Sequence, residues 1–223
     1  MKTFFTSLTL VLMFASCSNV PEMETGEIQT LQLLKKAFDS SNKPKRFLDS
    51  KTLLNRKRID EINTPLLFVE LPSGQNGTLV PYPGKGVGQT WLAADGATIT
   101  TDNGILKASR GMGDDLMGSS SSMPFWLNLD DETQAYSRVL IHITGSNKIS
   151  RRVFKCNIKK TINRGVIKIW EVTFKVDRFE ENCRNKSHSF RNIYYIDTQG
   201  IVRKSFQYHS DTIGYILMER LDR

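Results

Sequence analysis

In the second half of the chain, apolar residues recur at every second position, which predicts β-strands. The pattern is clear in residues 138–144 and 153–158, and it is clearest in residues 166–176. Asn163-Arg164-Gly165 is predicted as a turn before this third run. The residues expected on the apolar faces are Val139, Ile141, Ile143, Phe154, Cys156, Ile158, Val166, Trp170, Val172, Phe174 and Val176.

Three further strands are predicted near the C-terminus, in residues 192–197, 201–208 and 215–221, with a turn at 198–200. Each predicted strand has one apolar face and one polar face. That arrangement is typical of antiparallel sheets, whereas parallel sheets are covered on both sides. The sequence therefore predicts a mainly β protein: a curved antiparallel sheet or a partly closed β-barrel with an N-terminal helix over an opening or an edge.

The expected N-terminal helix covers residues 26–41, where the apolar spacing is helical, and it ends before Pro44 because proline cannot sit in a helix interior. A weaker helical or irregular piece is expected over 46–55, and a strand over 65–72. Residues 78–89 are predicted as a loop because they contain three glycines. The apolar face of the expected helix comprises Ile28, Leu31, Leu34 and Phe38, widened by Leu33 and Ala37.

Residues 90–111 are predicted as three short strands separated by Asp95-Gly96 and Asn103-Gly104. These dipeptides favour the tight turns that join antiparallel strands, because both tolerate positive φ. The segment 90–111 is therefore expected to form two consecutive hairpins.

The glycine-rich stretch that follows, residues 111–118, raises the question of a phosphate-binding loop. Such a loop needs glycine amides that lead into a helix, and here Asp114 and Asp115 would repel an anion. The stretch is predicted instead as a connection with a short helical turn at 114–117, and the serines of 118–122 are predicted as a flexible connection.

The N-terminus carries an export signal. Residues 1–16 hold one lysine and then an apolar run too short to span a bilayer. "FASC" ends at Cys17 and is similar to the lipobox of bacterial lipoproteins, which implies cleavage before Cys17 and acylation of that residue; the alternative is a plain signal peptide in which Cys17 is incidental. Residues 17–26 are predicted as a lipidated tether and residues 27–223 as a single β-rich domain.

Export also bears on the two remaining cysteines and on the charge. In an oxidising compartment Cys156 and Cys183 are expected to form a disulfide, with buried free thiols or a metal pair as alternatives. The net charge is +8, and removal of Lys2 with the signal leaves +7. Nucleic acid is excluded as a partner outside the cytoplasm, while an anionic lipid surface, an acidic polysaccharide or simply a solvated basic surface stay open.

No motif for catalysis is present in the sequence. The three histidines form no HExxH motif, and there is no GxSxG motif, so neither a catalytic metal nor a cofactor is expected. Paired acids could in principle hydrolyse a glycoside, but those available are expected in solvated loops. The acids considered are Asp114, Asp115, Asp130 and Asp131, and the aromatic residues expected mostly in the core are Trp91, Trp126, Trp170, Tyr194, Tyr195 and Tyr208.

From residue 28 to 208, the chain resembles the YjbF/GfcB family of group 4 capsule and exopolysaccharide lipoproteins. The matching features are Trp91, Asp95-Gly96, Asn103-Gly104, Gly111, Asp115-Leu116, Gly200, Ile201, Ser205 and Gln207. The resemblance implies an outer-membrane lipoprotein encoded with polysaccharide export machinery, and it implies no catalytic residues. Ser18 after the lipobox cysteine agrees with sorting to the outer membrane.

The function expected from these features is that of a non-catalytic periplasmic accessory of capsule or exopolysaccharide secretion or assembly. It would be anchored in the outer membrane through Cys17 and would contact polysaccharide or a protein of the export machinery. The alternatives are a lipid or lipoprotein carrier and a glycan-modifying enzyme. The residues expected at a binding surface are Asp102, Asn103, Gly104, Lys107, Arg110, Gly111, Asp114 and Asp115.

Overall fold

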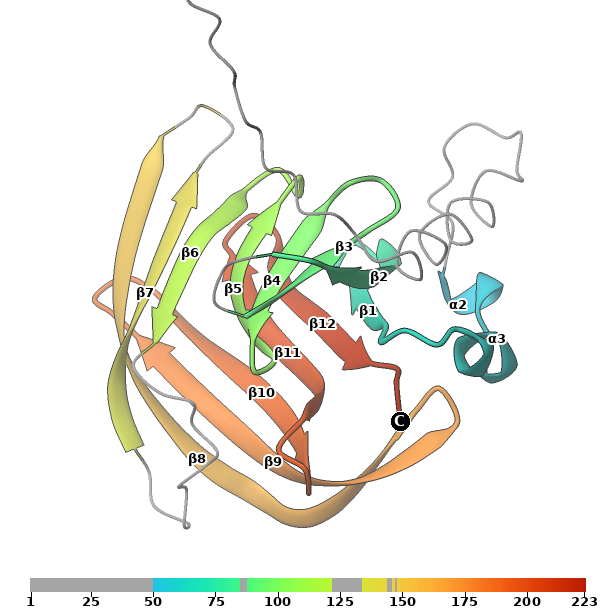
Figure 1. Cartoon of the computed structure of the whole chain (residues 1–223). Coiled ribbons are helices and arrows are strands. Elements are labelled where there is room, and N and C mark those ends of the chain that lie inside the picture. Colours follow the sequence, from blue (N-terminus) through green and yellow to red (C-terminus); the bar gives the residue numbers. More distant parts are fainter. Residues whose placement is uncertain (1–49, 85–87, 122–133, 144–145, 147) are drawn as a thin grey trace, which may run out of the picture.

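A computed structural model describes residues 50–84, 88–121, 134–143, 146 and 148–223, and it consists mainly of one large antiparallel sheet (Figure 1). The described strands are β1 (Leu67–Glu70), β2 (Asn76–Tyr82), β3 (Gln89–Leu92), β4 (Thr98–Asp102), β5 (Ile105–Arg110), β6 (Asp115–Ser121), β7 (Gln134–Ile143), β8 (Ile149–Ile169), β9 (Val172–Arg184), β10 (Ser189–Asp197), β11 (Val202–Ser210) and β12 (Gly214–Arg220). Their order across the sheet is β5-β4-β3-β2-β1-β12-β11-β10-β9-β8-β7-β6.

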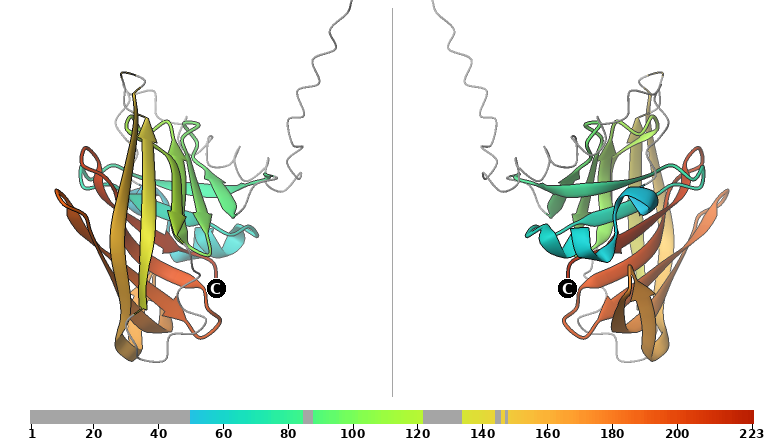
Figure 2. Two further views of the ribbon diagram at one scale, coloured as in Figure 1. Left: turned by 90° about the vertical axis from the view of Figure 1, so that its left-hand side faces the viewer. Right: turned by 90° about the vertical axis from the view of Figure 1, so that its right-hand side faces the viewer.

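The sheet curls until its two edge strands, β5 and β6, lie side by side (Figures 1 and 2). Side chains bridge this seam. The Leu116 N–H donates to Ser109 Oγ at 3.0 Å, and an Arg110 guanidinium N–H donates to the Leu116 carbonyl at 3.0 Å. The predicted mainly β fold, a partly closed antiparallel barrel, is therefore confirmed.

Two short helices, α2 (Ser50–Leu53) and α3 (Arg56–Glu61), pack beside β1 and β2 (Figure 2). Asn55 caps α3 by accepting a hydrogen bond from the Arg58 N–H at 3.0 Å. Buried Ile59 of α3 lies in a second apolar cluster with Phe68 and Val80. The helical piece expected over 46–55 thus contains α2, α3 was not predicted, and the helix expected over 26–41 lies outside the described residues.

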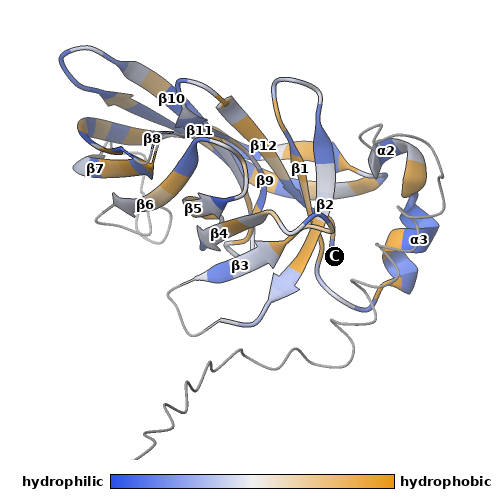
Figure 3. Ribbon diagram, turned by 90° about the horizontal axis from the view of Figure 1, so that it is seen from above, coloured by the Kyte–Doolittle hydropathy of each residue, from blue (hydrophilic) through white to orange (hydrophobic). Residues whose placement is uncertain are grey.

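Large side chains fill the barrel interior. Trp91, Phe154 and Tyr194 are fully buried, as are the two cysteines, and the Phe190 ring packs edge-on against Phe154 at 4.9 Å between ring centroids. Apolar and polar residues alternate along the strands (Figure 3). Among the described residues, no helix is long and apolar enough to cross a membrane.

The facing of β7 was predicted incorrectly. Val139, Ile141 and Ile143 share a face, as expected, but they are only half-buried, and the buried positions of the strand are Arg138, Leu140 and His142. Polar residues can occupy that side because their groups are satisfied by distant partners: Arg138 pairs with Glu181, and His142 Nε2 lies 2.7 Å from the His209 carbonyl. The apolar faces predicted for Phe154, Cys156 and Ile158 are buried, as expected.

The turn expected at 163–165 was wrong, and the single strand expected at 166–176 is instead the end of β8 and the start of β9. β8 continues to Ile169, and Asn163–Gly165 is an irregularity within it, where Arg164 has φ +55° and its N–H donates to Asp177 at 2.8 Å. The chain reverses instead at Trp170 and Glu171, with φ values of +44° and +72°. Neither residue type favours positive φ, so this two-residue turn has no signal in the sequence, and Trp170 is half-buried in the turn against Phe68.

Two segments predicted as irregular are strands. β2 occupies the first part of the loop expected at 78–89, as far as Tyr82. Pro81 fits there because the ladder with β1 ends at Leu79, so its missing N–H costs that ladder nothing. β6 replaces both the helical turn expected at 114–117 and the flexible serines. Its polar residue Ser119 is buried and accepts a hydrogen bond from Arg138 at 3.1 Å. Because a buried position of this strand is polar, the pattern of apolar residues does not reveal the strand.

The hairpins predicted in 90–111 are confirmed as β3, β4 and β5. Asn103 and Gly104, with φ of +49° and +81°, form a two-residue turn between the paired residues Asp102 and Ile105. Strands expected at 65–72, 192–197, 201–208 and 215–221 correspond to β1, β10, β11 and β12.

Candidate functional site

A cavity of about 460 Å³ opens at the end of the barrel where the β4–β5 and β10–β11 turns meet. We call it the end cavity. Its floor is buried and mixes apolar and polar side chains, whereas its rim is polar and partly exposed. The floor comprises Leu67, Trp91, Thr101, Val202, Ser205 and Met218, and the rim comprises Gly88, Gln89, Asp102, Asn103, Gly104, Gly200, Ile201 and Arg220.

Trp91 and Arg220 give the end cavity its fixed geometry. The indole N–H of Trp91 donates to Thr101 Oγ1 at 3.0 Å, and the Arg220 guanidinium lies 4.9 Å from the ring centroid. Asp222 holds that guanidinium through two hydrogen bonds, at 2.8 and 2.9 Å. An aromatic ring, a fixed cation and neutral hydrogen-bonding groups therefore converge on one concave site, as in small-ligand pockets.

Part of the surface predicted from the sequence lies at this cavity. Asp102, Asn103 and Gly104 are on its rim, and Lys107 lies beside them, with its ammonium 3.6 Å from Asp102. Gln207 holds the turn in place: its side-chain N–H donates to the Gly104 carbonyl at 2.7 Å, and its side-chain oxygen accepts from the Leu106 N–H at 2.9 Å.

The other predicted residues lie at the opposite end of β5, roughly 20 Å along the strand. There, Asp115 accepts hydrogen bonds from the backbone N–H groups of Gly111, at 3.0 Å, and Met112, at 2.9 Å. Arg110 donates to the carbonyl of Leu116 across the seam, and Asp114 lies in the same bend. These contacts hold the bend and close the barrel, so the eight predicted residues do not form one surface.

Sequence reasoning missed the remaining walls of the end cavity. Leu67, Met218 and Arg220 come from β1 and β12, which are paired although they lie at opposite ends of the described chain. Only the strand order brings them together, so no local pattern could identify them. Cys17, the predicted lipidation site, lies outside the described residues.

Gly104 provides a test of how tightly the two turns pack. A Cβ at this position would overlap the Val202 side chain, and φ is +81°. Gly104→Ala is therefore expected to lower the free energy of unfolding by about 3 kcal/mol, measured by urea denaturation. Gly96→Ala is the matched control, since φ is +92° there but nothing lies within 4 Å, and a loss of about 1 kcal/mol is expected. Equal losses of unfolding free energy in the two variants would contradict the close packing of Gly104 against Val202.

A serine–histidine pair lies in the barrel but does not fit a hydrolase. Ser109 Oγ is 2.8 Å from His209 Nε2, and both side chains are buried. His209 Nδ1 has no hydrogen-bond partner among the described residues, so nothing orients the imidazole as a catalytic triad requires. Burial, together with the neighbouring His142, lowers the pKa of His209 to about 4, so the ring is neutral near pH 7.

The barrel interior also holds a buried ion pair. Glu181 accepts hydrogen bonds from Arg138 Nε, Asn192 Nδ2 and the Tyr194 hydroxyl, each at 2.7 Å, and from the Tyr136 hydroxyl. Burial alone would raise the pKa of Glu181, but the Arg138 charge and these donors lower it below its ordinary value. The four donors saturate the carboxylate, so it is not available as a catalytic acid.

The expected disulfide joins Cys156 of β8 to Cys183 of β9, at directly paired positions. Its sequence separation is 27, for which the chain-entropy model gives a stabilisation of about 3.5 kcal/mol. Both cysteines lie within reach of Glu181, but a thiol pair for metal binding is absent because their sulfurs are bonded to each other.

Comparison with known proteins agrees with this fold. A family model described as "Group 4 capsule polysaccharide lipoprotein gfcB, YjbF" matches residues 28–221. The crystal structure of the hypothetical lipoprotein YmcC from Escherichia coli (K12) aligns with a TM-score of 0.69 and 17% identity, covering 92% of this chain and 98% of that chain. At that identity the likeness shows the fold. No curated protein matches the chain.

Proposed function

Because the chain belongs to the YjbF family of group 4 capsule polysaccharide lipoproteins, we propose that it is a non-catalytic accessory of capsule or exopolysaccharide secretion or assembly. In this proposal, acylated Cys17 anchors it in the outer membrane, and the barrel faces the periplasm. The barrel binds part of the polysaccharide in the end cavity and leaves the chain covalently unchanged.

The binding role rests on one observation. Six of the residues that carry the family resemblance come from separate stretches of the chain and meet at the end cavity: Trp91, Asn103, Gly104, Gly200, Ile201 and Ser205. A seventh, Gln207, holds the rim in place. The volume of about 460 Å³ lies within the range of ligand pockets. A mixture of amides, hydroxyls and an aromatic ring suits a saccharide, whose hydroxyl groups need hydrogen-bond partners.

The described residues favour binding over the two alternative functions. A lipid carrier needs a large apolar cavity, but Trp91, Phe154 and Tyr194 fill the interior. A glycosidase needs two carboxyl groups facing a sugar, whereas Asp115 is held by two backbone N–H groups and Asp102 is the one carboxylate that lines the end cavity within the described part of the chain.

The binding proposal predicts that the purified full-length lipoprotein binds capsule polysaccharide from the organism that encodes it, without changing the length of the polymer. Gln89→Trp, on the exposed rim, should block the end cavity and weaken binding about tenfold or more. Thr173→Trp, an exposed strand position away from the cavity, is the matched control and should leave binding unchanged.

Binding would be measured by isothermal titration calorimetry, and polymer length by size-exclusion chromatography before and after incubation. Shortened polymer would contradict the non-catalytic role. Identical affinities for the wild-type protein and Gln89→Trp would remove the end cavity from the proposal.

A further inference from the structure

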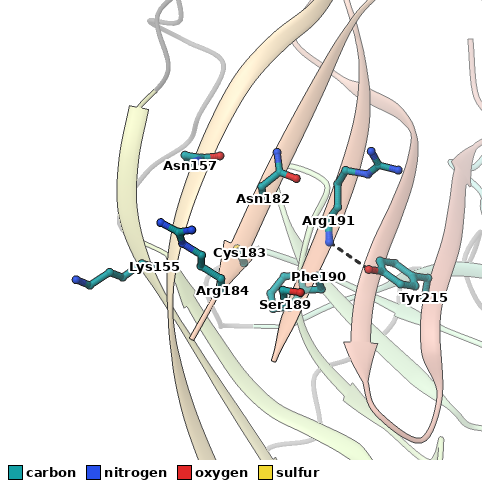
Figure 4. A pocket seen from close by; sticks show the side chains of 9 residues that line it. All are labelled: Lys155, Asn157, Asn182, Cys183, Arg184, Ser189, Phe190, Arg191 and Tyr215. Atoms are coloured by element: carbon teal, nitrogen blue, oxygen red, sulfur yellow. Dashed lines mark hydrogen bonds between the residues drawn. The ribbon is translucent and has the colours of Figure 1, made fainter. Parts of the chain in front are cut away.

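A second cavity, of about 580 Å³, is a groove on the outer face of β8, β9 and β10 (Figure 4). The strands alternate here: Cys156, Cys183 and Phe190 are buried, and the residues between them are exposed. Six exposed side chains line this outer groove: Lys155, Asn157, Asn182, Arg184, Ser189 and Arg191.

Strand register arranges these side chains in two rows across three strands, which Figure 4 shows one above the other. One row contains Lys155, paired with Arg184, which is paired in turn with Ser189. The other contains Asn157, paired with Asn182, which is paired in turn with Arg191. Directly paired side chains lie about 5 Å apart, so a single ligand group can contact two of them.

Two of the three cations in the outer groove, Lys155 and Arg184, are not compensated from within the sheet. Lys155 lies directly opposite Arg184, and like charges in that position destabilise a sheet. Among the described residues, neither Lys155 nor Arg184 forms an ion pair, and no carboxylate lines the groove. Arg191, the third cation, lies 3.8 Å from Glu180 at the edge of the groove, so its charge is partly compensated. By contrast, Lys159, one row further along β8, faces Glu180. The fold therefore gains nothing from the opposed cations, which favours an anionic ligand.

The neutral groups of the outer groove point to a hydroxylated ligand. Asn157 and Asn182 each offer amide donors and an acceptor, and asparagine is depleted in strands, so the sheet itself does not favour the pair. The Tyr215 hydroxyl accepts from the Arg191 N–H at 3.1 Å, which fixes its ring as a side wall. That ring packs edge-on against Tyr208, with centroids 5.7 Å apart.

The groove is also rigid beneath its surface. The Cys156–Cys183 disulfide lies between the two rows and ties β8 to β9 at the point where both rows cross from one strand to the other. Glu181 of β9 accepts hydrogen bonds from Asn192 and Tyr194 of β10 and from Arg138 and Tyr136 of β7, which ties β9 to β10 from the barrel interior. The backbone positions that carry the cations and amides are therefore fixed before a ligand arrives, which lowers the entropic cost of binding.

We propose that the outer groove is a second binding site, specific for an acidic polysaccharide segment. Carboxylate or phosphate groups of the chain contact Lys155, Arg184 and Arg191, and hydroxyl groups contact Asn157 and Asn182. The choice of a polysaccharide over an anionic membrane follows from the paired amides and the concave shape, and it rests on the proposed function.

The test uses the purified full-length lipoprotein in detergent, titrated with alginate oligosaccharides, which carry carboxylates and hydroxyls, and with neutral dextran of equal length. The wild-type protein should bind alginate and not dextran. Lys155→Gln with Arg184→Gln should weaken alginate binding about tenfold to a hundredfold. Lys168→Gln with Lys175→Gln removes the same charge from exposed positions of the same two strands and should change the affinity less than twofold.

Two further arms separate the ligand classes. Asn157→Ala with Asn182→Ala should weaken alginate binding severalfold and leave the binding of inorganic polyphosphate, which has no alcohol hydroxyls, unchanged. Vesicles of phosphatidylglycerol should bind no better to the wild-type protein than to the Lys155→Gln/Arg184→Gln variant. Circular dichroism of each variant verifies that the barrel is folded.

Three results would overturn the proposal. They are no alginate binding by the wild-type protein, equal weakening of alginate binding in Lys155→Gln/Arg184→Gln and Lys168→Gln/Lys175→Gln, and vesicle binding that depends on the outer groove. The proposed function is tested separately, because Gln89→Trp changes the end cavity and leaves the outer groove intact. Alginate binding that survives Gln89→Trp but not Lys155→Gln with Arg184→Gln belongs to the outer groove alone.

Discussion

Glu181→Gln is expected to lower the free energy of unfolding by about 3–5 kcal/mol at pH 7, because it breaks a buried ion pair by removing one partner. The substitution keeps the shape of the side chain, but Arg138, which is 2% exposed, keeps its charge in the interior. The new amide also turns one acceptor into a donor that faces donors from Asn192, Tyr194 and Tyr136. Urea denaturation followed by tryptophan fluorescence measures the loss.

Glu180→Gln is the matched control, since Glu180 precedes Glu181 on β9 and pairs with Arg178 near the surface. Partly solvated ion pairs contribute about 1 kcal/mol or less, so a small loss is expected. If the two variants lose the same free energy, the buried pair does not have the role assigned to it.

The loss at Glu181 should depend on pH in a defined direction. The pKa of Glu181 is lower in the folded protein than its ordinary value, so the pair contributes fully above the unfolded pKa of about 4.3. The contribution is lost as the pH falls through the folded pKa. The difference in unfolding free energy between wild type and Glu181→Gln should therefore be largest near neutral pH and shrink below about pH 4. A difference that stays constant from pH 7 to pH 3 would contradict the pKa direction.

The parts of the fold that were predictable from the sequence have local causes. Asp95-Gly96 and Asn103-Gly104 specify turns through their own backbone preferences, and the alternation in β10 to β12 reflects one face in water and one in the core. The disulfide between Cys156 and Cys183 was predictable from the inference that the protein is exported to an oxidising compartment. None of these features depends on knowing which strands are neighbours.

The parts that were missed depend on distant partners. Ser119, Arg138 and Glu181 look like surface residues in the sequence, but they satisfy one another across three strands of the barrel. β6 and the buried face of β7 were misassigned for that reason. The turn at Trp170 and Glu171 is held by packing rather than by residue preference, since Trp170 lies against Phe68, about a hundred residues earlier in the chain.

The two proposed binding sites were predictable to different extents. The surface predicted from the sequence includes one part of the rim of the end cavity, at Asp102, Asn103 and Gly104. Arg220 joins the rim only through the pairing of β1 with β12. The outer groove was not predicted, because exposed lysines and arginines are ordinary on a solvated strand. Its signal is the register that sets Lys155 opposite Arg184 and Asn157 opposite Asn182, and register is a property of the folded sheet.

The second large effect concerns the anchor. Each buried methylene of a lipid contributes about 0.8 kcal/mol to membrane binding, and two or more acyl chains hold a protein stably. In the proposed arrangement, Cys17→Ala should therefore release the protein from the outer membrane and separate it from the site of secretion. Surface polysaccharide should fall to the level of a gene deletion, a loss about tenfold or larger, even though the barrel itself is unchanged.

The proposed role is tested most directly by the amount of polysaccharide on the cell surface of a deletion strain complemented with the wild-type protein, with Cys17→Ala or with Gln89→Trp. Immunoblots of membrane fractions verify the level and location of each protein. The proposed role predicts that surface polysaccharide is lost on deletion and is restored by the wild-type protein but by neither variant. Surface polysaccharide that is unchanged in the deletion strain, under conditions where the gene is expressed, would contradict the proposed role in capsule secretion.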